Sequence, residues 1–149
     1  MRPLIRLAAV VLAPATLLLP ACAALAATCS VSPQDLTLGQ YDPLSTSSLN
    51  AVTNIVVTCD VTTAFVITLG PGNGTYLSRK MIGGSQTLTY NLFQDSSHNI
   101  VWGDGTNGSS SLSWSAVSKA FQVYAHAPGA QVLLKPGLYT DTISVTVTY

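Results

Sequence analysis

The sequence predicts an all-β protein, specifically an immunoglobulin-like β-sandwich. After residue 26 the chain is rich in Thr, Ser, Gly and Val, and no segment shows a convincing helical period. Seven or more short segments with alternating apolar residues follow one another, with turn signals between them. Two cysteines, Cys29 and Cys59, lie near the start of this region. Many short strands together with an early disulfide are typical of such sandwiches.

Residues 1–26 are interpreted as a secretory signal peptide. Arg2 and Arg6 form a short positive region, and an apolar run covers 7–19 before a stretch of small residues. The apolar run is shorter than the roughly 20 residues that a membrane span needs. We therefore expect no stable membrane insertion, and we expect export through the periplasm to the cell surface.

The cleavage site is expected at 24–26, which fits the small-x-small pattern, so the mature domain would span 27–149. A lipoprotein signal is the alternative, because 19–22 loosely resembles a lipobox. Pro20 stands beside the position that would be cleaved, and this disfavours the lipoprotein interpretation.

The charge of the mature domain is low. Residues 27–149 carry four Lys or Arg side chains against six Asp and no Glu, a net charge of 4 − 6 = −2. Nothing here is basic enough to indicate nucleic-acid binding. Because the domain is expected to be exported, Cys29 and Cys59 predict one disulfide. Closing a loop of about thirty residues would stabilise the fold by about 3–4 kcal/mol on the chain-entropy model.

Strands are expected in nine segments. They are a part of 28–40, in which Pro33 interrupts the pairing, then 53–59, 65–69, 76–82, 87–93, 100–102, 112–114, 120–127 and 138–149. Glycine-, proline- and asparagine-rich turns separate them, and 76–82 with 87–93 forms a hairpin around a tight turn.

Alternation within these strands predicts which side chains point into the core. The expected inward residues are Ile55, Val57, Cys59, Phe65, Ile67, Leu69, Leu88, Tyr90, Leu92, Phe121, Val123 and Ala125. Phe93 and Tyr124 are expected on the opposite faces of their strands.

The final segment, 138–149, has the clearest period of two. Its odd positions include Ile143, Val145 and Val147, and its even positions from 140 on carry only Thr or Ser. No later segment is available to cover the edge of this strand. An uncovered edge invites another chain to add a strand there.

No catalytic, cofactor or metal site is predicted. His98 and His126 lie far apart in sequence, outside any metal-ligand spacing, and are expected to be exposed. Residues 103–105 lack the oxygen ligands of a calcium loop, and 70–74 lacks the lysine and helix of a phosphate loop. No serine stands in the setting of a nucleophile. The protein is therefore expected not to be an enzyme.

Two other pairs have structural interpretations. Arg79 and Lys80 are expected to form a solvated hairpin edge. Trp102 and Trp114 flank a glycine- and serine-rich loop, and core packing is favoured for them over stacking on a sugar.

Six motifs resemble one known family when they are taken in order. They are TCSVS at 28–32, GQYDP at 39–43, IVVTC at 55–59, LTYNLF at 88–93, VWGDG at 101–105 and PGLYTDT at 136–142. Together they are similar to the spore coat protein U domain, which secreted coat proteins share with subunits of archaic chaperone–usher pili. The resemblance covers essentially all of 27–149.

The resemblance implies an incomplete sandwich that lacks its last strand. In such pili a periplasmic chaperone lends a strand to the gap, and a neighbouring subunit's N-terminal extension later replaces it. The expected partners are therefore that chaperone, an outer-membrane usher and neighbouring pilus or coat subunits. The expected strand-acceptor groove has Ile143, Val145 and Val147 facing Leu36 and Leu38.

The implied function is that of a structural subunit of a pilus or a surface coat. The alternative is a tip adhesin-like module that binds a surface or a glycan through the loops around Trp102, Tyr124 and Trp114. One feature departs from the family pattern, because only Ala27 and Thr28 would precede Cys29 after cleavage. The chain is therefore expected to accept a strand but not to donate one, which favours a terminal position or a coat role.

Overall fold

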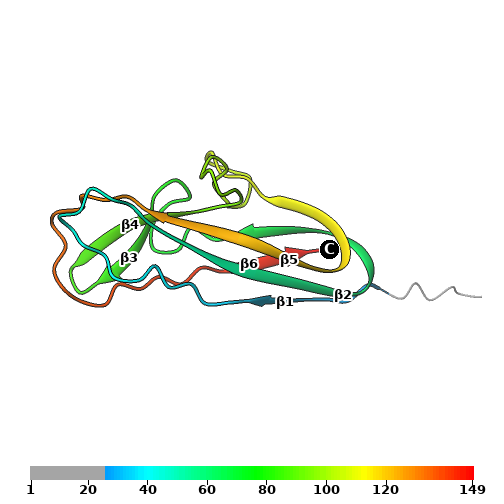
Figure 1. The fold of residues 1–149 in the computed structure, drawn as a ribbon. Coiled ribbons are helices and arrows are strands. Elements are labelled where there is room, and N and C mark those ends of the chain that lie inside the picture. The colour runs from blue at the N-terminus through cyan, green and yellow to red at the C-terminus, as the bar shows by residue number, and fades with distance from the viewer. Residues whose placement is uncertain (1–25) are drawn as a thin grey trace, which may run out of the picture.

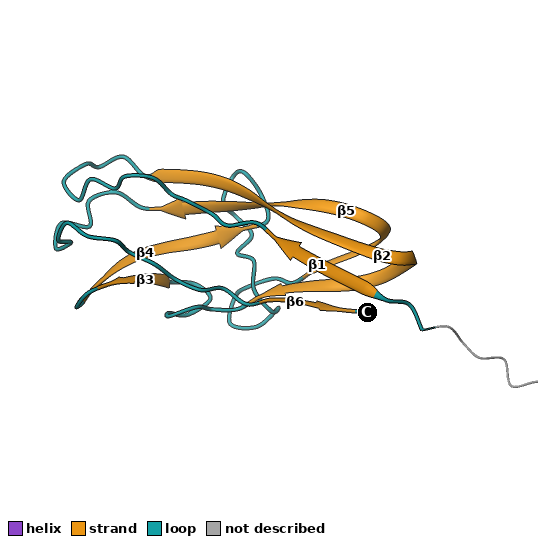
Figure 2. Ribbon diagram, turned by 90° about the horizontal axis from the view of Figure 1, so that it is seen from below, coloured by secondary structure: helices purple, strands orange, loops and turns teal. Residues whose placement is uncertain are grey.

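The computed structural model describes residues 26–149, and these contain strands, turns and loops but no helix (Figures 1 and 2). The prediction of an all-β chain is confirmed. Apart from Ala26, the predicted signal peptide lies outside the described residues, as does the alternative lipobox at 19–22. Within the described part, no helix is long and apolar enough to cross a membrane.

The described chain forms six strands, all of them paired antiparallel. Their bounds are β1 Cys29–Pro33, β2 Leu49–Leu69, β3 Arg79–Gly83, β4 Gln86–Phe93, β5 Leu112–Ala127 and β6 Val145–Thr148. The pairing order is β1-β2-β5-β4-β3, and β6 pairs separately with β2.

β2 is one long strand that bends and serves two layers. Its first half pairs with β1 and with the end of β5, and its second half pairs with β6 and the start of β5. The register shifts between Thr58 and Thr63, where the ribbon turns back on itself (Figure 1). A curled sheet of this kind encloses a core between two layers, as an immunoglobulin-like fold does.

Two pairs of expected strands are fused in the structure. Segments 53–59 and 65–69 are both parts of β2, and 112–114 and 120–127 are both parts of β5. Neither strand contains glycine or proline, so nothing in the backbone forces an interruption at the bend. Because β2 and β5 follow each other through the bend, their ladder resumes on its far side.

The final strand is shorter than predicted. Of 138–149, only Val145–Thr148 is a strand, although Thr140 forms an isolated bridge to Ile82. The preceding residues follow a different path because Asp141 accepts hydrogen bonds from the 71–74 loop. Segment 100–102 likewise makes only isolated bridges, from Val101 and Trp102.

The alternating core is confirmed. All twelve side chains expected to point inward are buried, and Trp102 and Ala127 join them. Phe93 is also buried, although it was expected on the outer face, because the ring of His98 packs against it at 5.1 Å.

The core prediction for Trp102 is correct, and its indole N–H donates to the Ile67 carbonyl at 3.2 Å. The same prediction for Trp114 is wrong, since this ring is 48% exposed.

Arg79 is a second correction, because its side chain is fully buried rather than solvated. Its guanidinium donates to the Gly70 carbonyl from Nε at 3.1 Å and from Nη2 at 2.8 Å. It also donates to the Trp102 carbonyl at 2.7 Å and to Asn91 Oδ1 at 2.6 Å. Desolvation lowers the pKa of Arg79, yet guanidinium stays charged in proteins. The sequence gives no sign of these partners, which come from three separate segments. The neighbouring Lys80 is exposed, as predicted.

We predict that Arg79→Met destabilises the fold by about 3 kcal/mol, because the Gly70 and Trp102 carbonyls and the Asn91 amide oxygen lose a charged donor. Lys80→Met is the matched control and should change stability by less than about 0.5 kcal/mol. Urea unfolding followed by tryptophan fluorescence measures both variants. Equal stabilities would show that the buried guanidinium contributes little.

Candidate functional site

The candidate site is the gap between two strand edges, β1 and β6. Among the described strands, each of these pairs with β2 alone, β1 on its first half and β6 on its second half. Because β2 turns back between these halves, β1 and β6 lie side by side and run in opposite directions (Figure 2). The hydrogen bond between them joins the Tyr149 hydroxyl to the Cys29 carbonyl at 3.4 Å.

The backbone of β6 presents unused hydrogen-bonding groups to this gap. The N–H of Gly70 donates to the Ser144 carbonyl at 2.9 Å, so the even-numbered residues of β6 bond to β2. In an antiparallel ladder the alternate residues point the other way. The N–H and C=O groups of Val145 and Val147 therefore face the gap.

The backbone groups of β1 also alternate between β2 and the gap. The Asp60 N–H donates to the Thr28 carbonyl at 3.1 Å, which places the even-numbered residues of β1 against β2. Cys29 and Val31 consequently turn their backbone groups to the gap, and the bond from Tyr149 to the Cys29 carbonyl agrees with this orientation. The gap is thus lined on both sides by strand edges that form no ladder with another described strand, although the Cys29 carbonyl already accepts from the Tyr149 hydroxyl.

Next to the Pro33 end of β1 and the Val145 end of β6, the gap opens into a groove made of two cavities. The first has a volume of about 310 Å³, and its floor consists of core side chains, among them Ile55, Leu92 and Val123. The second, of about 1180 Å³, lies between the segments 36–44 and 132–141. Leu36, Met81 and Asp141 line both cavities, so the two are adjacent.

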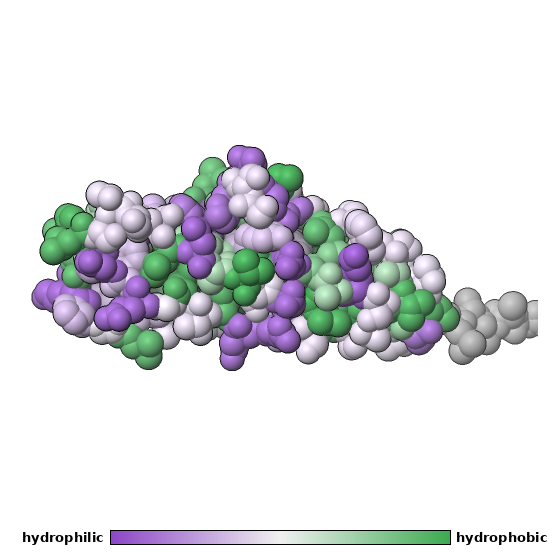
Figure 3. All heavy atoms as spheres, in the orientation of Figure 1, coloured by the Kyte–Doolittle hydropathy of each residue, from purple (hydrophilic) through white to green (hydrophobic). Residues whose placement is uncertain are grey.

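The five predicted groove residues are brought to this region. Leu36, Ile143 and Val145 line the first cavity, and Leu36 and Leu38 line the second. Val147 packs against the core beyond both cavities. All five side chains are partly buried. Apolar side chains also reach the outer surface at several places, separated by polar ones (Figure 3).

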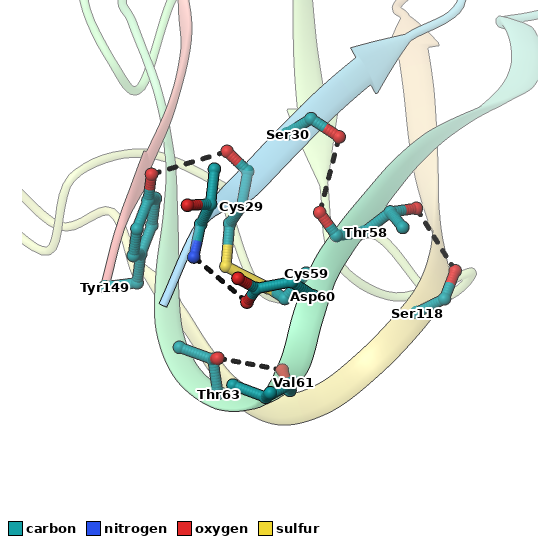
Figure 4. Close-up of a disulfide and its surroundings, with 10 residues drawn as sticks. Cys29, Ser30, Thr58, Cys59, Asp60, Val61, Thr63, Ser118 and Tyr149 are labelled. Atoms are coloured by element: carbon teal, nitrogen blue, oxygen red, sulfur yellow. Dashed lines mark hydrogen bonds between the residues drawn. A yellow bond between two sulfur atoms is a disulfide. The ribbon is translucent and has the colours of Figure 1, made fainter. Parts of the chain in front are cut away.

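The Cys29–Cys59 disulfide is confirmed, and it fixes one wall of the groove (Figure 4). The two cysteines are directly opposite each other in the β1–β2 ladder. Beside them, the Thr28 N–H donates to the Asp60 carboxylate at 3.0 Å and the Ser30 hydroxyl to the Thr58 carbonyl at 3.3 Å. β1 is only five residues long, so the covalent bond supplements a short ladder.

Asp141 holds the opposite wall, and the sequence analysis did not single it out. Its Oδ1 accepts from the Asn73 backbone N–H at 3.0 Å and from the Asn73 side-chain amide at 2.8 Å. Its Oδ2 accepts from the Tyr90 hydroxyl at 2.7 Å. Burial, and secondarily the bond to Asp141, raise the pKa of Tyr90, so this hydroxyl remains a donor. The carboxylate thus directs the chain that leads into β6.

Comparison with known proteins gives a family match and likenesses to solved structures. The family model described as Spore Coat Protein U domain matches residues 15–146. A similar solved chain is in the crystal structure of the CsuC–CsuE chaperone–tip adhesion subunit pre-assembly complex from archaic chaperone–usher Csu pili of Acinetobacter baumannii. The likeness has a TM-score of 0.59 at 23% identity, covering 83% of this chain and 40% of the other. No curated protein matches the sequence.

We predict that Asp141→Ala destabilises the fold by about 2 kcal/mol, since Asn73 and Tyr90 lose their acceptor. It should also speed hydrogen exchange at the Thr140 amide, which bonds to the Ile82 carbonyl at 3.0 Å. Asp35→Ala is the control, because Asp35 lines the same groove but is exposed. Unchanged exchange at Thr140 in the Asp141 variant would contradict the anchoring role.

Proposed function

The chain belongs to the Spore Coat Protein U domain family. We propose that it is a structural subunit of a secreted surface assembly, and that a strand from another protein completes its β-sandwich. The observation that carries this proposal is the groove between β1 and β6, with free backbone edges on both sides and apolar residues below. The sandwich would be completed by a donor strand pairing with Cys29 and Val31 on one side and with Val145 and Val147 on the other.

The energy available to such a strand is substantial. Alternate apolar side chains of a donor would cover a few hundred Å² of the groove, which corresponds to roughly 5–10 kcal/mol before ordering costs at about 25 cal/mol per Å². Main-chain hydrogen bonds along the two edges would add modestly. Without a donor, the exposed groove and edges favour aggregation.

The proposed partners follow from this need for a strand. A periplasmic chaperone would occupy the groove first, an outer-membrane usher would release the subunit, and a neighbouring subunit would then supply the final strand. The likeness to a chain from a chaperone–tip adhesion subunit complex supports partners of this class. The chain spans 40% of that solved chain, so nothing about its further parts is transferred. The proposal assigns no enzymatic activity.

The position in the assembly is a further part of the proposal. We propose that residues 1–26 are removed on export, that 27–149 is the assembled domain, and that it occupies a terminal position. The support is the short stretch, Ala27 and Thr28, that would remain before Cys29. N-terminal sequencing of the exported protein tests the cleavage site directly.

The alternative, a tip adhesin-like module, has partial support. Trp102 is fully buried and is therefore unavailable to a ligand. Trp114 is 48% exposed, with the Lys119 ammonium 5.2 Å from its ring centroid. An exposed aromatic of this kind can stack on a sugar. Glycan binding that is lost in Trp114→Ala, with strand capture intact, would favour the adhesin role.

We predict that Val145→Asp abolishes capture of a chaperone or a donor peptide, because its side chain and backbone both belong to the groove side. Thr146→Asp should have a much smaller effect, since Thr146 is exposed and alternate residues face opposite sides. Pull-down with the cognate chaperone and thermal melting with an alternating apolar peptide measure both variants.

The proposal fails if the wild-type domain is soluble alone, melts at high temperature and binds neither the chaperone nor any peptide. It also fails if Val145→Asp and Thr146→Asp capture a strand equally well.

A further inference from the structure

Two histidines that are distant in sequence meet on the outer face of the sheet. The ring centroids of His98 and His126 are 4.9 Å apart, with 40° between their planes. His126 lies in β5 between Ala125 and Ala127, which are both fully buried. Successive side chains of a strand alternate between faces, so His126 points away from the core. The pair is therefore separate from the groove.

His98 is held in place by its turn. The His98 N–H donates to the Asp95 carbonyl at 3.2 Å, and the Asp95 carboxylate accepts from the N–H groups of Asn99 and Ile100. His98 has φ of +56°, a conformation that costs energy in a residue with a side chain. Such conformations persist where the surroundings fix them, and they concentrate at functional positions. The ring of His98 is thus presented to His126 by a defined backbone.

The ring of His126 is oriented by a neighbouring strand. Its Nδ1 lies 2.8 Å from the amide oxygen of Asn50 in β2. An amide oxygen can only accept, so Nδ1 carries the proton and Nε2 keeps its lone pair. A histidine that donates one N–H to an oxygen and offers the other nitrogen is the usual arrangement of a metal ligand.

The separation of the rings fits a shared ion. A metal–nitrogen bond of about 2.1 Å places the centroid of a coordinating imidazole about 3.2 Å from a zinc ion. Two such centroids lie ~4.5 Å apart when the nitrogen–metal–nitrogen angle is 90°. They lie ~5.2 Å apart when that angle is tetrahedral. The observed 4.9 Å falls between these values. Within residues 26–149 no group of three or more His, Cys, Asp or Glu side chains could hold a metal. An ion here would therefore keep open positions for water or an outside donor.

We propose that His98 and His126 form an open two-histidine site for a divalent transition metal such as Zn²⁺ or Ni²⁺. Imidazole nitrogen suits both ions. Asn50 is a positioning residue, because it holds the His126 ring in the tautomer that leaves Nε2 free. The two histidines leave the remaining coordination positions for water or for a donor from a second molecule.

The test is isothermal titration of the exported protein, without a polyhistidine tag, with Zn²⁺ and separately with Ni²⁺. We expect one ion per chain, loss of binding in His98→Gln and in His126→Gln, and affinity about 10-fold weaker in Asn50→Ala. Asn54→Ala is the matched control on the same strand and should bind as wild type. In ¹⁵N spectra, Asn50→Ala should shift the tautomer balance of His126, a change that a merely structural role would not produce.

Absence of binding in the wild type, or wild-type affinity in either histidine variant, overturns the proposal. If a glutamine variant fails to fold, the ¹⁵N signals of both imidazoles in the wild type test the proposal instead. Added Zn²⁺ must shift the signals of His98 and His126 together, and a shift of neither or of only one overturns the proposal. Strand capture should be unchanged in the histidine variants, so the metal-site proposal and the strand-capture proposal can be refuted independently.

Discussion

The bend in β2 is the constraint on which the rest of the structure depends. One strand supplies the partner for β1 with its first half and for β6 with its second half, and β5 follows it through the turn. This continuity places two unpaired edges next to each other over a shared apolar floor. If β2 ended at the bend, β1 and β6 would be linked only through β5, and no single strand would set their spacing.

Two polar side chains keep the far end of the groove in shape. Arg79 joins the Gly70 carbonyl, which follows β2, to the Trp102 carbonyl. Asp141, which lies in the segment before β6, binds the 71–74 loop and Tyr90. Both are largely enclosed and both satisfy several partners at once, which makes polar groups in such places stabilising rather than costly. The hydrogen bonds of Arg79 and Asp141 therefore tie together segments that are distant in sequence beside the groove.

The sequence predicts those parts of this structure that depend on local pattern. Alternation identified the buried faces around Ile67 and Val123, and the odd-numbered residues of the last segment, because side-chain direction in a strand follows from position alone. It could not show that β2 continues through its bend, since that depends on the partner strand. Arg79, Asp141 and the pairing of His98 with His126 were missed for the same reason, because their contacts join segments that only the fold brings together.

The placement of the disulfide has a mechanical consequence for a strand seated between β1 and β6. Tension along such a strand loads its hydrogen bonds in shear, so that both ladders must break together rather than one bond at a time. On one side the load passes from β1 into β2 through the covalent Cys29–Cys59 bond, which does not rupture under forces that separate ladders. On the other side it passes through the four-residue pairing of β6 with β2. The first element to yield under pulling is therefore expected to be β6, at the carboxyl end of the chain.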